Sequence, residues 1–221
     1  MIDTARFVQK TVEIELNSSN DNPLIVVSRR EAFHNANFHG QYMANAMDQL
    51  AIVVINLCNL SDRRNDRLLD PDHNGSLPAF LCKENPGMRL GLMGGQFAAT
   101  SLVAEMRSMA TPVSVQTLTS TGDFQDHVSM GLIAARRARD LLKNAYYVVG
   151  FELLCAAQAA DQRNVADLSP VTRVVYDIVR ERIPYLDHDE PLTDHIEVAA
   201  DLFASGALLK ALPETSPAYN W

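Results

Sequence analysis

Apolar residues recur at helical spacing along most of the chain. Between residues 41 and 69 they fall three or four positions apart, which predicts one long helix. A second helix is predicted over about 88–109, and a third over about 125–160, roughly 50 Å long at 1.5 Å per residue. The segment Leu50–Leu60 is apolar almost all round, so it should lie buried among other helices. The pattern therefore predicts a mainly α protein built as a long-helix bundle.

Shorter elements are predicted on both sides of these helices. An apolar stripe over residues 5–16 indicates a helix that begins almost at Met1 and has nothing before it to pack against. The runs Leu24–Val27 and Ala32–His34 flank a turn-like segment and predict a minor β-hairpin. The unpartnered stripe suggests that the chain is one half of a larger structure.

Capping signals place two further helices near the C-terminus. Ser169-Pro170 has the N-cap and first-turn residues of a helix that should end before Pro184. Thr193 is expected to cap the last helix, which should run to about Leu212. Because no linker or internal repeat interrupts the pattern, residues 1–221 are expected to form a single helical region.

Composition narrows the function classes. Among 221 residues, 27 are acidic and 19 are basic, and this net charge of −8 argues against a nucleic-acid partner. The longest purely apolar run, Leu50–Ile55, is too short for a membrane span. The N-terminus has no apolar signal core, and Cys58, Cys82 and Cys155 form no CxxC motif. We therefore expect a cytoplasmic protein with neither a membrane nor a nucleic-acid partner.

Two apparent motifs are better explained as coincidences. Residues 70–75 match the first half of a calcium-binding EF-hand loop, but its twelfth position, which should supply a bidentate Glu, is Leu81. No histidine pair has zinc-ligand spacing, so no metal site is predicted. Asp126, His127 and Ser129 are too close together in sequence to align as a catalytic triad.

Two polar segments are harder to explain by packing alone. The cluster over residues 17–24, followed by 37–41, is rich in Asn and Asp, which fix a backbone through side-chain hydrogen bonds. The run 120–130 is predicted to open the longest helix, where free N–H groups could hold an anionic substrate or position an amide. Turn and cap chemistry alone remains the alternative for both segments.

Taken in order, these segments resemble the C-terminal half of the aromatic amino acid ammonia-lyase and 2,3-aminomutase family. The resemblance is close from Glu15 to about Arg163 and looser over the remainder. Within the family, the pattern resembles that of bacterial phenylalanine aminomutase. It implies the long-helix bundle of the ammonia-lyase (fumarase/aspartase-like) type. The anchors are Asn17-Ser-Ser-Asn-Asp-Asn-Pro-Leu24, Asn37-Phe-His-Gly-Gln41, Leu60-Ser-Asp-Arg-Arg64, Leu77-Pro-Ala-Phe-Leu81, Gly91-Leu-Met-Gly-Gly-Gln96, Glu105 and Gly122-Asp-Phe-Gln-Asp-His-Val-Ser-Met130.

The resemblance also implies a mechanism and site residues. Family members eliminate ammonia from an aromatic amino acid with the electrophile 4-methylideneimidazol-5-one (MIO), and aminomutases return the ammonia to the β-carbon. By this resemblance Asn22 lines the pocket near the cofactor, and Phe38 packs by the substrate. Gln125 lies beside the substrate amine, where histidine-specific members have Glu, and Phe124 matches the aminomutase pattern. The pair favours phenylalanine or tyrosine as substrate.

The chain lacks other parts that the family requires. Ala204-Ser205-Gly206 has neither the flanking residues nor the position of the triplet that forms MIO, so the cofactor is expected from a missing N-terminal half. The catalytic Tyr loop and the carboxylate-binding Arg belong to that half as well. We expect an N-terminal partner, a homo- or hetero-oligomer with a tetramer-like core, and an inactive isolated chain. A non-catalytic helical scaffold or regulatory module derived from the family is the alternative, and lyase and aminomutase activities both stay open.

Overall fold

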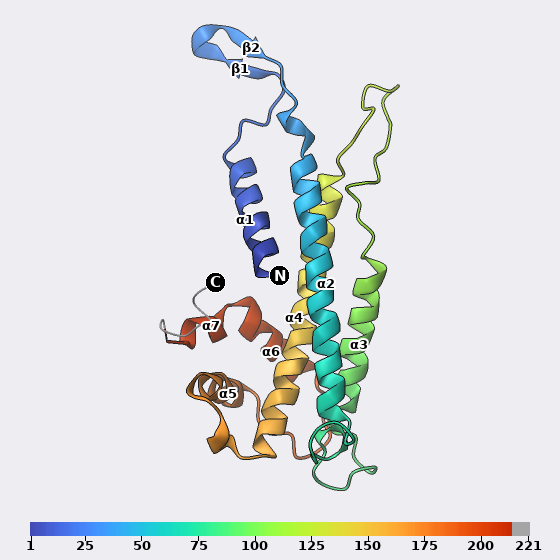
Figure 1. Ribbon diagram of the computed structural model, residues 1–221, viewed down its shortest axis with the longest axis vertical. Coiled ribbons are helices and arrows are strands. Elements are labelled where there is room, and N and C mark those ends of the chain that lie inside the picture. The colour runs from blue at the N-terminus through green and yellow to red at the C-terminus, as the bar shows by residue number, and fades with distance from the viewer. Residues whose placement is uncertain (214–221) are drawn as a thin grey trace. The chain divides into compact units, whose positions relative to one another are not determined.

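The computed structural model describes residues 1–213, which divide into two compact units. One unit comprises Met1–Ile55 and Ser108–Leu142, and the other comprises Asn56–Arg107 and the residues that follow Leu142. The mainly α architecture with one minor hairpin is confirmed (Figure 1). The elements are α1 (Ile2–Leu16), β1 (Leu24–Val26), β2 (Glu31–Phe33), α2 (Gln41–Leu69), α3 (Met93–Ser108), α4 (Gly131–Asp161), α5 (Pro170–Arg182), α6 (Thr193–Ala204) and α7 (Ala207–Ala211).

The predicted bounds hold for α2 and fail at the N-terminal ends of α3 and α4. Helix α3 begins at Met93 rather than near 88, because Gly91 adopts a φ of +52° in a loop that packs against the carbonyl of Phe80. Helix α4 begins at Gly131 rather than near Gln125, and Met130 just before it has a φ of +59°. The prediction that the polar run 120–130 opens the longest helix is therefore wrong.

The C-terminal helices follow the capping signals only in part. The Ser169 side chain accepts a hydrogen bond from the Thr172 N–H at 3.2 Å, which confirms it as the N-cap of α5. The last helix is not continuous to Leu212, because Gly206 adopts a φ of +69° and separates α6 from α7. Thr193 is the first residue of α6 and not its cap, which is Leu192 without a side-chain hydrogen bond.

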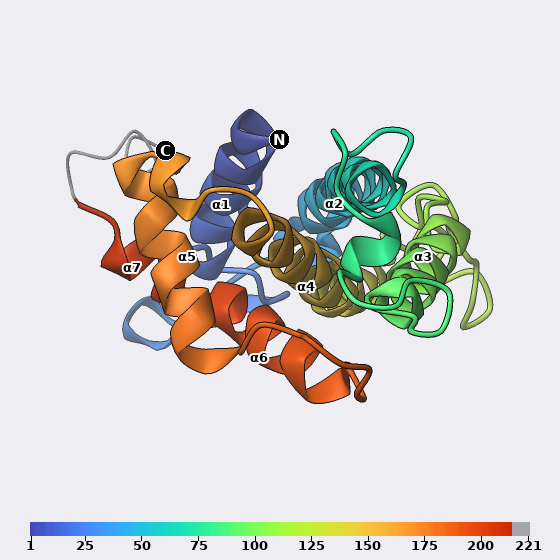
Figure 2. The ribbon, with the colours of Figure 1, turned by 90° about the horizontal axis from the view of Figure 1, so that it is seen from below.

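The unit that contains residues 143–213 has a continuous apolar core. Phe151, Leu154 and Leu202 are fully buried in it, together with Val179 from α5. Figures 1 and 2 both place α5 and α6 beside the C-terminal part of α4. Close packing of α4 and α6 depends on Gly150, since a Cβ there would lie 2.8 Å from the Ala200 nitrogen.

The unit that contains Met1 holds the hairpin, α1 and a buried ion pair. The hairpin, which Figure 1 shows beyond the C-terminal end of α1, is antiparallel and pairs Leu24 with Phe33. Asp48 of α2 and Arg137 of α4 form an ion pair whose side chains are 5% and 12% exposed. Arg137 also donates to the Thr111 carbonyl, and Asp48 accepts from the Ser114 N–H at 2.8 Å. These contacts fix the start of the segment that carries residues 117–130.

Two apolar features of the helices are not explained by the core. Val8 is the buried residue of α1, whereas Phe7, Ile14 and Leu16 are 47%, 56% and 79% exposed. Among the described residues one stretch, Asn37–Leu69, is a helix long and apolar enough to cross a membrane by length and composition. The core helix of a soluble protein passes the same test. Val54 and Cys58 of α2 are buried, whereas Ile52 and Leu60 are 42% and 53% exposed, so the burial predicted for Leu50–Leu60 is only partial.

Candidate functional site

The Asn-rich segment 17–24 is held by side-chain hydrogen bonds, as its composition predicts. The Asn22 Oδ1 accepts from the Asn35 N–H at 3.0 Å, and the Asn35 amide donates to the Asp21 carbonyl at 2.8 Å. The Asn35 Oδ1 in turn accepts from the Asn37 N–H at 2.8 Å. This chain of contacts ties Asn22, which precedes a cis peptide bond to Pro23, to the turn that begins at Asn37.

That turn presents Phe38 on the surface at the start of α2. Asn37–His39 form one 3-10 turn, and Gly40 closes it with a φ of +72°, a conformation that glycine adopts at little cost. The Phe38 side chain remains 53% exposed. An aromatic ring left half in solvent contributes little to folding, so it is available to pack against a ligand or a partner.

The segment 117–130 forms an irregular hairpin-like loop rather than a helix. Ser120 and Gln125 exchange both backbone hydrogen bonds, at 3.0 and 3.2 Å. Below this bridge the Thr117 hydroxyl accepts from the Val128 N–H at 2.8 Å. At its tip Thr121, Gly122 and Asp123 all have positive φ, which is incompatible with a right-handed helix. Gln125 therefore does not lie at a helix N-terminus, and the anion site expected from that position is not formed.

Phe124 and Gln125 are presented outward by this loop. Phe124 is 81% exposed, and Gln125 is exposed as well. The Gln125 backbone is paired, whereas its side-chain amide makes no hydrogen bond within residues 1–213. An exposed phenyl ring beside an unused amide can offer apolar contact and neutral hydrogen bonding to a small molecule.

Two histidines join the turn to the loop. The His39 Nε2 lies 3.2 Å from the His127 carbonyl oxygen and 3.4 Å from the His127 Nδ1. Their rings are stacked, with centroids 5.5 Å apart and an interplanar angle of 24°. Phe38 therefore immediately precedes one member of the pair, and Phe124 and Gln125 closely precede the other. Sequence reasoning missed this pair, although both histidines lie within anchors of the family resemblance.

The four predicted site residues thus lie on segments that hydrogen bonds join to one another. The described residues do not enclose the four side chains. A cavity of about 390 Å³ in the same unit lies beside the turn that carries Phe38 and is lined by other residues, among them Asn20, His39 and Tyr42. Asn22, Phe38, Phe124 and Gln125 are all exposed. The arrangement is that of one open side of a site.

A comparison with protein families covers the turn at residues 37–39 and the loop at residues 117–130. The family model described as "Aromatic amino acid lyase" matches residues 1–181. The chain belongs to this family. Its helices also superpose on a solved structure of phenylalanine aminomutase from Pantoea agglomerans with a TM-score of 0.86 and 52% identity, over 91% of this chain and 39% of the other. The family-type helical bundle predicted from the sequence is confirmed.

Other relatives include both ammonia-lyases and an aminomutase. A tyrosine ammonia-lyase from Cupriavidus metallidurans is 49% identical over 95% of this chain and 39% of its own length. The structure of a tyrosine aminomutase from Streptomyces globisporus has a TM-score of 0.89 and 43% identity, over 95% of this chain and 40% of that one. A histidine ammonia-lyase from Natranaerobius thermophilus is 42% identical over 91% of this chain and 39% of its own length. The chain spans about two fifths of these proteins.

In this lyase-family chain the Ala204-Ser205-Gly206 triplet terminates a helix. The Ser205 hydroxyl donates to the Asp201 carbonyl at 2.7 Å, and the Ser205 carbonyl accepts from the Lys210 ammonium at 3.0 Å. Its backbone is helical at Ser205 and left-handed at Gly206. All of these contacts are those of a turn between α6 and α7.

The loop over residues 70–75, which resembles half of an EF-hand, also has a structural explanation. The Asp70 carboxylate accepts from the Asp72 N–H at 2.9 Å and pairs with His73 at 2.7 Å. The Asn74 side chain accepts from the Leu77 N–H at 2.9 Å and donates to the Leu68 carbonyl. Both side chains are used to build the loop after α2. Within residues 1–213 no group of three or more potential metal-ligating side chains is found.

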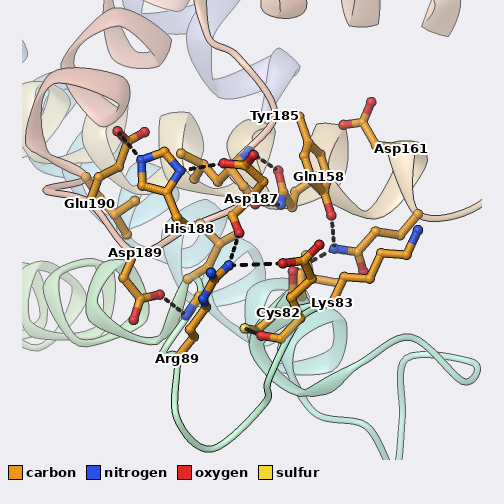
Figure 3. Close-up of a pocket in the computed structure, with 17 residues that line it drawn as sticks. Cys82, Lys83, Arg89, Gln158, Asp161, Tyr185, Asp187, His188, Asp189 and Glu190 are labelled. Atoms are coloured by element: carbon orange, nitrogen blue, oxygen red, sulfur yellow. Dashed lines mark hydrogen bonds and ion pairs between the residues drawn. The ribbon is translucent and has the colours of Figure 1, made fainter.

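A second cavity, of about 320 Å³, lies in the unit that contains residues 143–213. Figure 3 shows His188 between Asp187 and Glu190 at its edge, with Arg89 and Tyr185 among its walls. The Asp187 carboxylate accepts a hydrogen bond of 2.5 Å from the His188 Nδ1–H, which raises the pKa of His188 and lowers that of Asp187. The Asp189 carboxylate accepts from the Leu90 and Gly91 N–H groups at 2.9 and 3.0 Å. At this cavity Arg89 pairs with Glu84, and His188 pairs with Asp187 and Glu190.

Proposed function

We propose that the chain is the C-terminal portion, or a separate C-terminal subunit, of an MIO-dependent ammonia-lyase or 2,3-aminomutase that acts on an aromatic amino acid. The observation that carries the proposal is the match over residues 1–181, which includes Asn22, Phe38, Phe124 and Gln125. About half of the residues are identical to a tyrosine ammonia-lyase and to a phenylalanine aminomutase, so both reaction types stay open.

Phe124 and Gln125 favour phenylalanine or tyrosine over histidine as the substrate. A carboxylate at position 125 could accept a charge-assisted hydrogen bond from an imidazole N–H, whereas a neutral amide offers only a weaker one. The exposed Phe124 ring makes the neighbourhood more apolar, and it can stack edge-to-face on a phenyl or phenol ring. These side chains would orient an aromatic ring and exclude water from it.

The exposed groups fit a planar, carbonyl-bearing prosthetic group. The Asn22 Oδ1 is committed to Asn35, whereas the Asn22 Nδ2 makes no hydrogen bond within the described residues and is available as a donor. The Gln125 amide can donate and accept, and Phe38 offers an apolar face. When bound, MIO supplies the electrophile of the reaction. Asn22 and Phe38 are the residues of this chain that would contact it.

In the proposed reaction the residues of this chain bind and orient the substrate. Elimination breaks the bond from Cα to nitrogen and removes a proton from Cβ, and the C–H electron pair forms the new double bond. Gln125 would hydrogen-bond near the departing amine while Phe38 and Phe124 hold the ring. We propose that a general base for the β-proton and a cation for the carboxylate come from outside this chain. We therefore propose a cofactor-bearing N-terminal half or partner subunit.

Assembly into a homo- or hetero-oligomer with a tetramer-like core is part of the proposal. The exposed apolar side chains of α1, Phe7, Ile14 and Leu16, need a partner surface. The acidic charge and the three buried free cysteines support a cytoplasmic enzyme with no nucleic-acid or membrane partner.

The experiment combines the chain with a cofactor-bearing N-terminal half and follows the products from phenylalanine, tyrosine and histidine. We expect an α,β-unsaturated acid, a β-amino acid or both from phenylalanine or tyrosine, and no turnover by the chain alone. The same assay on Asn22→Ala should show a large loss of activity, with His34→Asn, directly after β2, as the control. An inactive but correctly assembled complex would favour the scaffold or regulatory alternative.

A further inference from the structure

One tautomer of His39 satisfies both of its contacts with His127. The His127 carbonyl can only accept, so a hydrogen bond to it over 3.2 Å requires the tautomer that carries the proton on the His39 Nε2. The His127 Nδ1, 3.4 Å from the same nitrogen, then presents its lone pair to that N–H. One N–H is thus shared between two acceptors on one residue 88 positions away.

This link lies between the two parts of the proposed substrate site. The turn and the loop also approach each other at their bases, where a Cβ on Gly40 would lie 3.6 Å from the Ser129 hydroxyl. Gln41 adds a hydrogen bond of 3.2 Å to the Ser114 carbonyl. The histidine pair adds a contact directly after Phe38 on the turn and two residues after Gln125 on the loop.

We propose that His39 and His127 are positioning residues, which set the separation of Phe38 from Phe124 and Gln125 and thereby the fit of the substrate's aromatic ring. The proposal rests on the function proposed above, because it assigns both segments to one pocket. The exposed loop has positive φ at Thr121, Gly122 and Asp123 and little burial of its own, so its position depends on such ties.

The test uses two amides that differ in reach. Gln carries its amide nitrogen at about the distance of the His Nε2 from the backbone, so His39→Gln keeps the donor to the His127 carbonyl. Asn is one carbon shorter, so His39→Asn has an amide that falls short of it. His34→Asn serves as the control, since it makes the same change five residues away, directly after β2, where His34 makes no hydrogen bond or ion pair within residues 1–213.

The first measurement is amide hydrogen exchange of residues 117–128 in the full 221-residue chain, and it needs no activity. His39→Asn should raise exchange of this loop about two- to tenfold, the usual effect of losing one hydrogen bond. His39→Gln and His34→Asn should leave it unchanged. Unchanged exchange in His39→Asn, with helix content equal by circular dichroism, would overturn the proposal.

The second measurement is steady-state kinetics of the chain combined with its cofactor-bearing half. His39→Asn should raise KM for the aromatic substrate about two- to tenfold with a smaller change in kcat, because it alters ring placement rather than the chemistry. His39→Gln should restore KM. An inactive wild-type complex would count against the proposed function only, since the exchange measurement decides the link separately. An unchanged KM in an active His39→Asn enzyme would overturn the positioning role.

Discussion

The ring of Phe151 occupies the space that a side chain on Gly95 would need. A Cβ on Gly95 would lie 2.8 Å from the Phe151 Cδ2 and closer still to its Cε2. Phe151 is fully buried, so the ring has no room to move away. Helix α3 can therefore lie this close to α4 only because position 95 has no side chain.

We predict that Gly95→Ala lowers the free energy of unfolding by about 1–3 kcal/mol through overpacking. The neighbouring Gly94→Ala is the matched control, because Gly94 is exposed and nothing lies within 4 Å of its Cβ position. That variant should be neutral or stabilising by up to about 1 kcal/mol. Urea denaturation of both measures the difference, and equal stabilities would show that the packing is not as described.

A second pair of substitutions compares two helix starts. Ser169→Ala should cost about 0.5–2 kcal/mol of stability, since it removes the side-chain cap of α5. Thr193→Ala should cost less than about 0.5 kcal/mol, because the Thr193 side chain does not cap α6. Thermal and urea unfolding of the two variants provide the measurement. A larger loss for Thr193→Ala would restore the cap predicted from the sequence.

The third prediction concerns His188 and Asp187. The His188 Nδ1–H donates a hydrogen bond to the Asp187 carboxylate, and this one bond raises the pKa of His188 above 6.5 and lowers the pKa of Asp187 below 3.8. The contribution of His188 to the free energy of unfolding is complete below pH 6.5 and is lost as the pH rises through the raised pKa of His188. The contribution of Asp187 to the free energy of unfolding is complete above pH 3.8 and is lost as the pH falls through the lowered pKa of Asp187. The pair therefore stabilises the fold most between these limits.

An NMR titration of His188 tests this coupling. Asp187→Asn should bring the pKa of His188 back toward 6.5. Glu190→Gln should lower that pKa less, because the charge of Glu190 is a smaller cause than the Asp187 hydrogen bond. If the two substitutions lower it equally, the Asp187 contact is not the main cause.

The buried thiols give a fourth prediction. Burial, with a smaller effect of the Glu152 charge, raises the pKa of Cys58 to about 11 and that of Cys155 well above its ordinary value. The thiolate is the reactive form, so neither thiol should react with iodoacetamide at pH 8 in the native protein. Mass spectrometry should find both alkylated after unfolding in urea. Rapid native labelling of Cys155 would contradict its complete burial.

The helical architecture was predictable because long amphipathic helices carry a strong periodic signal. Helix α2 matches its predicted bounds, as does the Ser169 cap, where local sequence decides the structure. The start of α4 was not predictable from the sequence. Apolar residues on both sides of Met130 continue the helical spacing, while the backbone of Met130 itself is left-handed. Single residues with positive φ leave no periodic trace.

The site residues were predictable only through the family resemblance, and their surroundings were not. Nothing in the sequence pairs Asp48 with Arg137 or His39 with His127, since contacts between distant positions have no local pattern. The side-chain network around Asn22 and Asn35 was foreseen in kind, because Asn and Asp at this density form such bonds.

The central claim is that Gln125 and Phe124 contact an aromatic amino acid in a complete lyase or aminomutase. The most direct measurement is kcat/KM for phenylalanine, tyrosine and histidine with the chain combined with its cofactor-bearing half, as wild type and as Gln125→Glu. We predict that the wild type prefers phenylalanine or tyrosine, and that Gln125→Glu shifts the ratio toward histidine by about tenfold or more. Highest activity on histidine in the wild type, or an unchanged ratio in Gln125→Glu, would contradict the claim.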